Sequence, residues 1–497
     1  MEANDAITDH STTPLRSIQQ SSSSLSSIEE HSAIQYEFNQ PQQDDDEEEE
    51  EEEQLQNHQN HQNYQNYQNH QNYQNHQNHQ NHQNQHAWKH LQTKYNYTDS
   101  DESFIRALPK VELHVHFDGA IDPQLLYEHL QKTKDYSCFP MTTILPWNNA
   151  FSIRQKVQEC STISQFHTLC TCRGKASLQA MIEAFQIFTP ILRGNLNLLE
   201  TMAYDLTKRQ AAQNIIYTEL RYSPHLLTHG ATFTIGDPLD DPTTVETVIN
   251  AITAGLRRGC YEFGIHIQQI LCCICWRPDW AMEVVQLCHQ KRHDYPCAVV
   301  GIDIAAGEEH FDQTDLSHEA AMKAAQELGL NITIHAGEVG NAKNVQHAID
   351  NYGAKRIGHG YHIIHDEELM NTMRKQNIHV EVCPTSSVET GGWNVTPHHK
   401  DWNHHPATTM LENKILLGLN SDDPAVFDTS LTWQYRIALA KMGFSRDDLI
   451  QTIRNSIDAA FCPTLEKERL HSLINDFQQG ILVPSTIPHD ERIGEYD

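Results

Sequence analysis

The sequence has few basic residues and no long apolar segment. Its 497 residues contain 35 lysines and arginines against 66 aspartates and glutamates, which gives a formal net charge of −31 at pH 7. This excess of negative charge repels a phosphate backbone, so we expect no nucleic-acid partner. No stretch is long and apolar enough to span a membrane. The first residues, MEANDAITDHSTTPLRS, contain no basic segment followed by an apolar one, so we expect no secretory signal.

Cysteine is missing from the first 137 residues, and all 12 cysteines follow. Cys170 and Cys172 form a C-x-C pair, and Cys272, Cys273 and Cys275 form a cluster. Neither group has the paired C-x₂-C spacing of a structural zinc site. A long chain without a secretory signal keeps its thiols reduced, so we predict free buried thiols and a cytoplasmic protein.

The first 100 residues contain few large apolar side chains, and they hold 17 of the 66 acidic residues but only 3 of the 35 basic ones. Residues 44–53 are ten consecutive acids, and residues 56–82 repeat Gln-Asn-His or Gln-Asn-Tyr every three positions. Such a polar segment cannot offset the entropy of ordering, so we predict a disordered low-complexity tail over residues 1–100. The histidines could bind metal loosely, or the Asn/Gln run could assemble, but we favour a tail with little effect on the chemistry.

Short apolar runs alternate with longer amphipathic segments, such as 315–328 and 366–375, in the rest of the chain. The eight short runs are 110–117, 214–222, 265–274, 298–305, 331–336, 356–360, 379–384 and 415–421. This alternation predicts parallel strands with helical crossovers. Eight strands form a closed (β/α)₈ barrel of the TIM type, an α/β fold that we predict for residues 104–490. A doubly wound open sheet is the alternative, although no G-x-G-x-x-G follows the first run.

The first run, within Lys110–Ala120 (KVELHVHFDGA), alternates apolar and polar residues as a β-strand does. Residues at i and i+2 of a strand point to the same side, so His114 and His116 can reach one point. A divalent metal such as Zn²⁺ needs imidazole nitrogens in this arrangement. A half-buried strand with two hydrogen-bonded histidines is the simpler interpretation of this run alone.

Polar residues gather where four of the predicted strands end. The first run ends in His-x-His-x-Asp-Gly, the fifth in His335-Ala-Gly-Glu338, the sixth in Gly358-His359-Gly360 and the eighth in Asn420-Ser421-Asp422-Asp423-Pro424. In a parallel barrel these ends open on one face, which carries the active site. Three histidines and one carboxylate can then enclose a metal, and a set without cysteine suits catalytic Zn²⁺ that also holds water. These predicted ligands are His114, His116, His335 and Asp422.

Three further polar residues, Glu338, His359 and Asp423, stand next to the predicted ligands. Metal-assisted hydrolysis needs a proton donor, a group that orients the water and a base, and a metal lowers the pKa of bound water toward about 7. Each residue also has an ordinary explanation. Glu338 could stabilise a helix N-terminus, His359 could belong to a turn, and Asp423 could be a turn residue before proline. Their coincidence at strand ends favours hydrolysis.

The longest insertion, residues 121–213, contains an apolar stripe at helical spacing. Its members are Leu178, Met181, Ile182 and Phe185. Such a stripe usually packs in a core. A lid over an apolar pocket is the other possibility.

Six motifs in order resemble the adenosine deaminase family, over residues 108–478. The motifs are Pro109–Ala120 (PKVELHVHFDGA), Leu220–Leu226 (LRYSPHL), His335–Val339 (HAGEV), Arg356–Tyr361 (RIGHGY), Glu381–Ser387 (EVCPTSS) and Leu419–Pro424 (LNSDDP). The resemblance implies a zinc enzyme on a (β/α)₈ barrel, with one Zn²⁺ per chain. It also implies hydrolysis of adenosine and 2′-deoxyadenosine to inosine and 2′-deoxyinosine plus ammonia, in purine salvage and catabolism.

The resemblance also implies roles for individual residues. The zinc ligands are His114, His116, His335 and Asp422. Glu338 donates a proton to purine N1, His359 orients the attacking hydroxide, and Asp423 hydrogen-bonds both the hydroxide and purine N7. The apolar stripe aligns with the family's substrate gate, which favours the lid.

Substrate contacts are implied for His116, Asp118, Gly307 and Asp423. The family's fourth strand usually ends Asp-Leu-Ala-Gly-Asp-Glu, and its glycine amide contacts purine N3. Here Ala306 occupies the glycine position without a gap, and Gly307 occupies it after a one-residue shift. We favour Gly307 because a close approach favours glycine.

Asp118 faces the ribose 5′-hydroxyl in this resemblance, and its charge would repel a 5′-phosphate. A free nucleoside is therefore the expected small-molecule partner. Two alternatives remain: a related deaminase of adenine, AMP or an N6-modified adenosine, and a non-catalytic nucleoside-binding module. The sequence does not determine the oligomeric state, and we favour a monomer.

Overall fold

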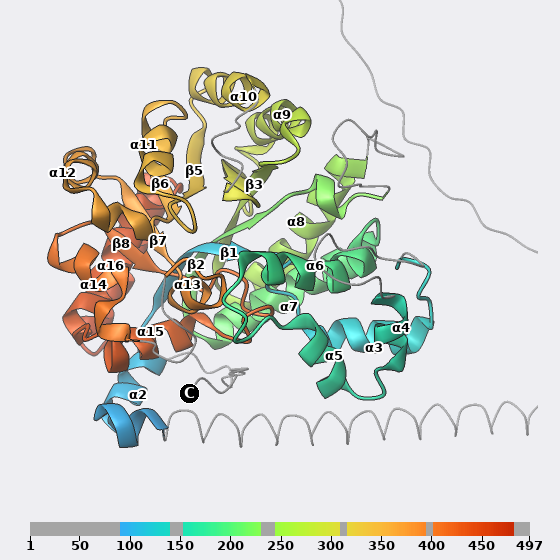
Figure 1. Ribbon diagram of the computed structural model, residues 1–497, viewed down its shortest axis with the longest axis horizontal. Helices are drawn as coiled ribbons and strands as arrows, with labels where there is room; N and C mark the ends of the chain where they lie inside the picture. The colour runs from blue at the N-terminus through green and yellow to red at the C-terminus, as the bar shows by residue number, and fades with distance from the viewer. Residues whose placement is uncertain (1–89, 140–152, 230–243, 309–315, 394–400, 482–497) are drawn as a thin grey trace, which may run out of the picture. The chain divides into compact units, whose positions relative to one another are not determined.

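The computed structural model describes residues 90–139, 153–229, 244–308, 316–393 and 401–481 (Figure 1). All of them belong to one compact unit, Asn75–Asp497. Most of the predicted tail, residues 1–89, lies outside the described residues, as does the end of the predicted barrel beyond residue 481. The architecture below therefore concerns the barrel alone.

Eight parallel strands form one sheet in the order β1 to β8. They are β1 (Lys110–His116), β2 (Ile215–Tyr222), β3 (His266–Ile274), β4 (Val299–Ala305), β5 (Asn331–Ala336), β6 (Arg356–His359), β7 (His379–Val382) and β8 (Leu417–Leu419). The chain just after β8 returns to β1, where Asp422 forms a bridge with Val115. This contact closes the sheet, so the predicted (β/α)₈ barrel is confirmed and the open-sheet alternative is wrong. Each predicted strand coincides with an observed one.

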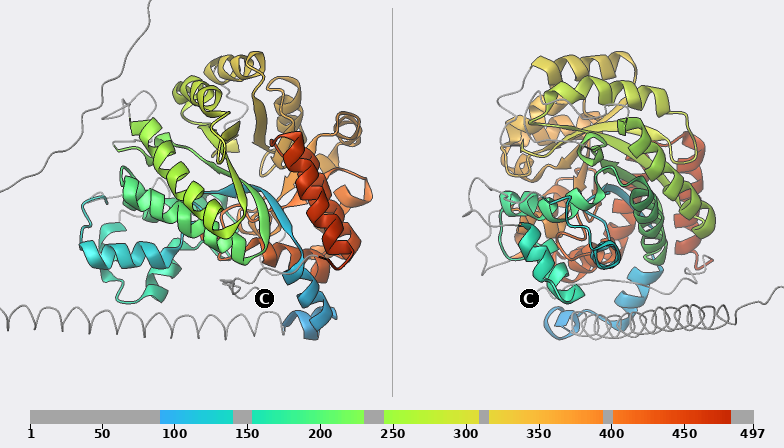
Figure 2. Two further views of the ribbon diagram at one scale, coloured as in Figure 1. Left: turned by 180° about the vertical axis from the view of Figure 1, so that it is seen from behind. Right: turned by 90° about the vertical axis from the view of Figure 1, so that its right-hand side faces the viewer.

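Helices surround the strands on the outside (Figure 2). The longer ones are α2 (Asp99–Ala107), α3 (Pro123–Thr133), α6 (Leu178–Leu192), α7 (Leu196–Ala212), α8 (Thr244–Phe263), α9 (Ala281–Lys291), α10 (Leu316–Glu327), α11 (Ala342–Asp350), α12 (Glu367–Gln376), α15 (Leu431–Lys441), α16 (Arg446–Ala459) and α17 (Thr464–Gln478). The shorter ones are α4 (Ile153–Glu159), α5 (Ile163–Cys170), α13 (Pro384–Glu389), α14 (Pro406–Glu412), and the 3₁₀ turns η1 (His225–Leu227), η2 (Pro278–Trp280), η4 (Tyr361–His365) and η5 (Trp402–His404). The strands are consequently buried on both faces, which explains their nearly continuous apolar character.

The folded chain starts earlier than the predicted start at residue 104. Helix α2 begins at Asp99, and the side chain of Thr98 caps it by accepting a hydrogen bond from the amide of Asp101. Leu91 and Tyr97 are buried. The missed signal is the capping box formed by Thr98 and Asp101, which marks a helix start without an apolar run.

Strand β1 is completely buried except at its last residue, so the half-buried strand considered above is wrong. Its pairing with β2 is irregular between Glu112 and Val115. Bulges of this kind are common next to active sites, where they redirect side chains. The rings of His114 and His116 still lie on the same side, with their centroids 5.3 Å apart.

All twelve cysteines lie in the described part of the chain, and all twelve are free thiols. Eight of them are buried, in agreement with the prediction. No helix within the described ranges combines the length and apolar character that crossing a membrane requires.

Candidate active site

A pocket opens at the C-terminal ends of the strands, with a volume of about 980 Å³ when the space open to solvent is included. Its lining contains all of the predicted site residues except one: His116, Asp118, Gly307, His335, Glu338, His359, Asp422 and Asp423. The exception, His114, is fully buried and contacts Asp422, which does line the pocket. The barrel thus brings together residues that are far apart in the sequence.

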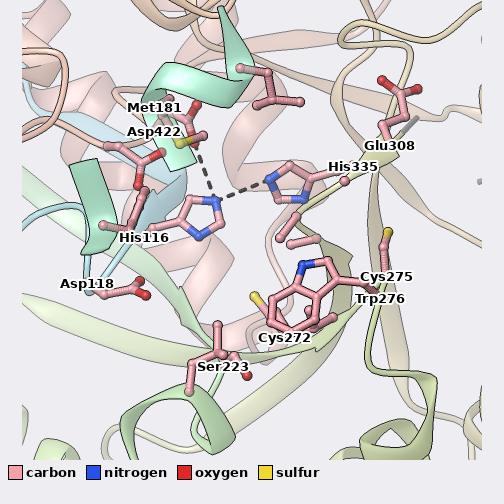
Figure 3. A pocket seen from close by; sticks show the side chains of 18 of the residues that line it. His116, Asp118, Met181, Ser223, Cys272, Cys275, Trp276, Glu308, His335 and Asp422 are labelled. Atoms are coloured by element: carbon pink, nitrogen blue, oxygen red, sulfur yellow. Dashed lines mark hydrogen bonds and ion pairs between the residues drawn. The ribbon is translucent and has the colours of Figure 1, made fainter. Parts of the chain in front are cut away.

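The four predicted metal ligands lie in mutual contact. The Nε2 atom of His116 is 3.2 Å from Nε2 of His335 and 3.4 Å from Oδ1 of Asp422. Nε2 of His114 is 3.2 Å from the same carboxylate oxygen. Figure 3 shows His116 directed toward both His335 and Asp422. A cation held between the rings could be bound by these nitrogen and oxygen atoms together.

Two buried carboxylates contact the outer nitrogen, Nδ1, of two of these rings. Nδ1 of His114 lies 2.8 Å from Oε2 of Glu381, and Nδ1 of His335 lies 2.9 Å from Oδ2 of Asp303. A carboxylate at Nδ1 fixes the proton there and leaves the lone pair on Nε2, which faces the site. This support is typical of histidines that bind a metal.

Both carboxylates belong to a buried chain of alternating charges. Arg221 contacts Asp303 at 2.9 Å and Glu381 at 2.8 Å, and Arg356 contacts Glu381 at 2.7 Å and Glu219 at 2.6 Å. We call these five residues the interior ion-pair chain. Burial alone would raise the pKa of Glu381, but the two arginines hold that pKa well below its ordinary value. The carboxylates that orient the histidines therefore stay ionised.

His359 lies between the ligand set and Glu338. Its Nε2 atom is 3.7 Å from Oε2 of Glu338 and 4.0 Å from Oδ2 of Asp422. Its Nδ1 atom lies 3.2 Å from the hydroxyl of Tyr361. The ring is thus held by its outer nitrogen and presents the inner one to the pocket.

Two overlapping groups of the described residues could hold a metal ion. The first group is His114, His335, His359 and Asp422, and the second is His116, Asp422 and Asp423. Asp422 is common to both. His359 takes the place of the predicted ligand His116 in the first group, so the assignment of His116 as the fourth ligand stays a prediction.

Two site residues adopt left-handed backbone conformations. His359 has φ of 67° and Asp422 has φ of 64°. Such conformations are costly for residues with a side chain and persist where the surroundings enforce them, often at functional sites. Close packing also constrains Gly358, because a Cβ added there would lie 2.9 Å from the ring of His114.

Burial changes the protonation of several groups in the pocket. It lowers the pKa of His116 and His359 well below their ordinary value, so both rings are neutral. It raises the pKa of Asp118 to about 6. Burial, together with the neighbouring Asp422, raises the pKa of Asp423 well above its ordinary value. A carboxyl group that keeps its proton can donate a hydrogen bond to an acceptor such as a ring nitrogen.

Helix α6 forms one wall of the pocket. Leu178, Met181 and Phe185 line it, as the lid interpretation of the apolar stripe requires. The side chain of Ile182, the remaining member, lies outside the described part. Movement of the helix stays a prediction.

The end of β4 forms another part of the wall, with both Ala306 and Gly307 in the lining. Both residues have positive φ, at 62° for Ala306 and 108° for Gly307. The left-handed conformation of Ala306 is one that glycine adopts more easily. The assignment of the purine contact to Gly307 therefore stays a prediction.

Several residues that shape the site were not identified from the sequence. Asp303, Glu381 and Arg221 support the histidines, and Glu308 lies in the lining (Figure 3). The signal available for the first three was a charged residue inside an apolar strand, since such residues are rarely buried without a partner.

Comparison with known families gives a match over residues 109–477 to the model described as Adenosine deaminase. The adenosine deaminase of Bos taurus is 32% identical over 369 residues, which cover 74% of this chain and 93% of that protein. That of Mus musculus is 33% identical over 379 residues, covering 74% and 97%. These matches extend over nearly the whole length of the relatives.

Among solved structures, an amidohydrolase from Burkholderia ambifaria with bound zinc has a similar fold, with a TM-score of 0.62. It is 22% identical, and the match covers 77% of this chain and 94% of that one.

Proposed function

Because the chain belongs to the adenosine deaminase family, we propose that it hydrolyses adenosine and 2′-deoxyadenosine to inosine and 2′-deoxyinosine with release of ammonia. Family membership makes it a metal-dependent hydrolase that deaminates its substrate. The convergence of three histidines and Asp422 beside Glu338 in one pocket carries the proposal. The reaction would serve purine salvage and catabolism.

We assign one Zn²⁺ per chain to His114, His116, His335 and Asp422. Nitrogen and oxygen donors without a thiolate suit a catalytic zinc ion. When bound, Zn²⁺ lowers the pKa of a water molecule in the site toward about 7. The carboxylates at the outer nitrogens of His114 and His335 support this assignment, because they direct both lone pairs inward.

Three residues carry the proton transfers in this proposal. Glu338 donates a proton to purine N1, which makes C6 electrophilic. The neutral ring of His359 orients the attacking water and takes up its proton. Asp423 donates a hydrogen bond to N7. The oxygen of water bonds to C6, and the proton taken up by His359 passes to the amino nitrogen. The bond from C6 to that nitrogen then breaks and ammonia leaves, while the remaining hydroxyl proton passes to Glu338 as C6 becomes a carbonyl.

The charge of the pocket supports a free nucleoside as the substrate. The lining contains Asp118, Glu308, Glu338, Asp422 and Asp423 but no lysine or arginine among the described residues. A 5′-phosphate would lose its hydration without gaining a cationic partner, which disfavours AMP. We propose that Asp118 instead binds the ribose 5′-hydroxyl, and that His116 and the Gly307 amide contact the purine.

We further propose that the chain consists of a low-complexity tail and the barrel, and that the barrel acts alone as a monomer. The burial of Leu91 and Tyr97 and the cap at Thr98 support a boundary earlier in the chain than residue 104. Deletion of residues 1–89 should leave turnover within about threefold. The twelve free thiols support a reducing compartment such as the cytoplasm.

The test follows the ultraviolet absorbance of adenosine as the purified full-length protein is added. We expect the change from adenosine to inosine, its loss after treatment with a chelator, and its return with added Zn²⁺. 2′-Deoxyadenosine, adenine, AMP and N6-methyladenosine are compared at equal concentration, with the two nucleosides expected to react fastest.

The alternatives predict different outcomes. Faster reaction of adenine, AMP or N6-methyladenosine would replace the proposed substrate with a related one. Tight binding of adenosine by the metal-loaded protein without any inosine would support a binding module and contradict the proposed catalysis.

A further inference from the structure

Glu308 is a buried carboxylate at the end of β4, and its side chain is 4% exposed. It lines the pocket and is labelled in Figure 3. No lysine or arginine of the described residues forms an ion pair with it. A buried carboxylate without a cationic partner is costly unless hydrogen bonds satisfy it, so its hydrogen bonds decide why it is there.

The carboxylate of Glu308 accepts hydrogen bonds from four consecutive backbone amides. Its Oε2 atom lies 2.8 Å from the amide nitrogen of Glu338, 2.8 Å from that of Val339 and 2.9 Å from that of Gly340. Its Oε1 atom accepts from the amide of Gly337. One side chain from the end of β4 thus holds the whole turn that follows β5.

Two neighbours complete the enclosure of this carboxylate. Nδ2 of Asn344, in the first turn of α11, lies 3.2 Å from Oε1 of Glu308. Gly340 leaves room for it, because an added Cβ there would lie 2.7 Å from Oε1. The site is therefore built for a carboxylate of this length.

We propose that Glu308 is a positioning residue that holds residues 337–340 so that the side chain of Glu338 is presented to the substrate. This inference rests on the proposed role of Glu338. Glu308 touches neither the predicted metal ligands nor the reacting atoms in the described contacts, and acts through the turn. The turn begins with Gly337 at φ of 68°, and the carbonyl of Gly337 accepts a hydrogen bond from the amide of His362 at 3.3 Å. A displacement of about 1 Å at a catalytic group can reduce turnover by about 100-fold.

Direct evidence comes from hydrogen exchange of the amides of residues 337–340, which is independent of activity. In Glu308→Ala these amides lose their acceptor and should exchange at least about tenfold faster than in the wild type. The matched control is Glu102→Gln, a change at another buried carboxylate, paired with Arg436 far from the pocket. It should leave exchange at 337–340 and turnover unchanged.

Kinetics tests the functional part of the inference. We expect kcat to fall about 100-fold in Glu308→Ala, with KM within about threefold and zinc content unchanged. Glu308→Gln keeps one acceptor oxygen, so its kcat should be about tenfold higher than that of Glu308→Ala. This partial rescue separates positioning from a general loss of folding.

A double-mutant cycle shows whether the effect passes through Glu338. In the Glu338→Gln background, adding Glu308→Ala should reduce the remaining turnover by less than about threefold. A full 100-fold loss in that background, unchanged exchange at 337–340, or loss of zinc would overturn the inference. If Glu338→Gln alone keeps normal turnover, the proposed role of Glu338 fails instead. The exchange experiment then still shows whether Glu308 holds the turn.

Discussion

The two ends of the barrel are both lined by buried charged residues, yet they differ in how these charges are paired. At the N-terminal end, Glu219 contacts Arg356 and accepts a hydrogen bond from the hydroxyl of Tyr217 at 2.9 Å. The guanidinium of Arg356 lies 3.7 Å from the ring centre of Phe461. Glu219 and Arg356 thus each have a partner of opposite or complementary character, as a structural site requires.

At the C-terminal end, like groups face each other. Asp422 and Asp423 are adjacent, Glu338 lies in the same pocket, and ring nitrogens of His116 and His335 are 3.2 Å apart. Such an arrangement is unfavourable by itself and is maintained by the surrounding fold. Buried charge alone therefore does not identify an active site in this molecule. The gathering of several carboxylates and imidazoles around one pocket distinguishes the C-terminal end.

The largest effect expected from this comparison is at the C-terminal end. Glu338→Gln removes the proposed proton donor but keeps the shape of the side chain, so turnover should fall by about 10³–10⁴-fold. Steady-state kinetics with zinc analysis and a thermal melt measures it, and neither zinc content nor the melting temperature should change. Turnover within tenfold of wild type would remove Glu338 from the mechanism.

A change at the N-terminal end should affect stability and leave catalysis intact. Glu219→Gln leaves Arg356 with one carboxylate partner instead of two, and breaking a buried pair costs about 3–5 kcal/mol. Denaturant unfolding should show this loss, while kcat per folded molecule stays at the wild-type value. A large fall in kcat without a loss of stability would show that the two ends are not separate in function.

The interior ion-pair chain connects the two ends, and Asp303 is its member that contacts His335. Asp303→Asn weakens the hold on Nδ1 of His335 and should lower zinc affinity by about 10–100-fold. Competition with a zinc-binding dye measures it. Glu219→Gln serves as the comparison and should bind zinc normally, and equal losses in both variants would contradict a local effect.

The smallest effect concerns the strained residue in the pocket wall. Ala306→Gly relieves the left-handed conformation, which costs alanine about 1–2 kcal/mol, against about 0.5–1 kcal/mol for the greater freedom of glycine when unfolded. The free energy of unfolding should therefore rise by about 0.5–1 kcal/mol. A decrease would mean that the methyl group contributes packing worth more than the strain.

Much of the fold followed from the order of apolar runs, because strands buried on both faces leave nearly continuous apolar stretches. The meeting of the strand-end residues in one pocket also followed, since a parallel barrel opens all these ends on one face. The side chains that support those residues could not be predicted from the sequence. Nothing in local sequence pairs Glu381 with His114, or Glu308 with the turn at 337–340. Such pairs depend on how neighbouring strands are aligned, and that is set by the packing of the whole barrel.

The seam of the barrel has a consequence for synthesis of the chain. The amide of His116 donates to the carbonyl of Asp422, and the amide of Asp422 donates to the carbonyl of His114. The predicted ligands on β1, His114 and His116, are thus joined to the predicted ligand Asp422 after β8 by the same backbone contacts that close the sheet. A nascent chain on the ribosome cannot complete this cluster until the segment after β8 has emerged. Capture of the metal would then report that the barrel has closed, and shortened products that end before this segment would remain inactive however well their first seven strands fold.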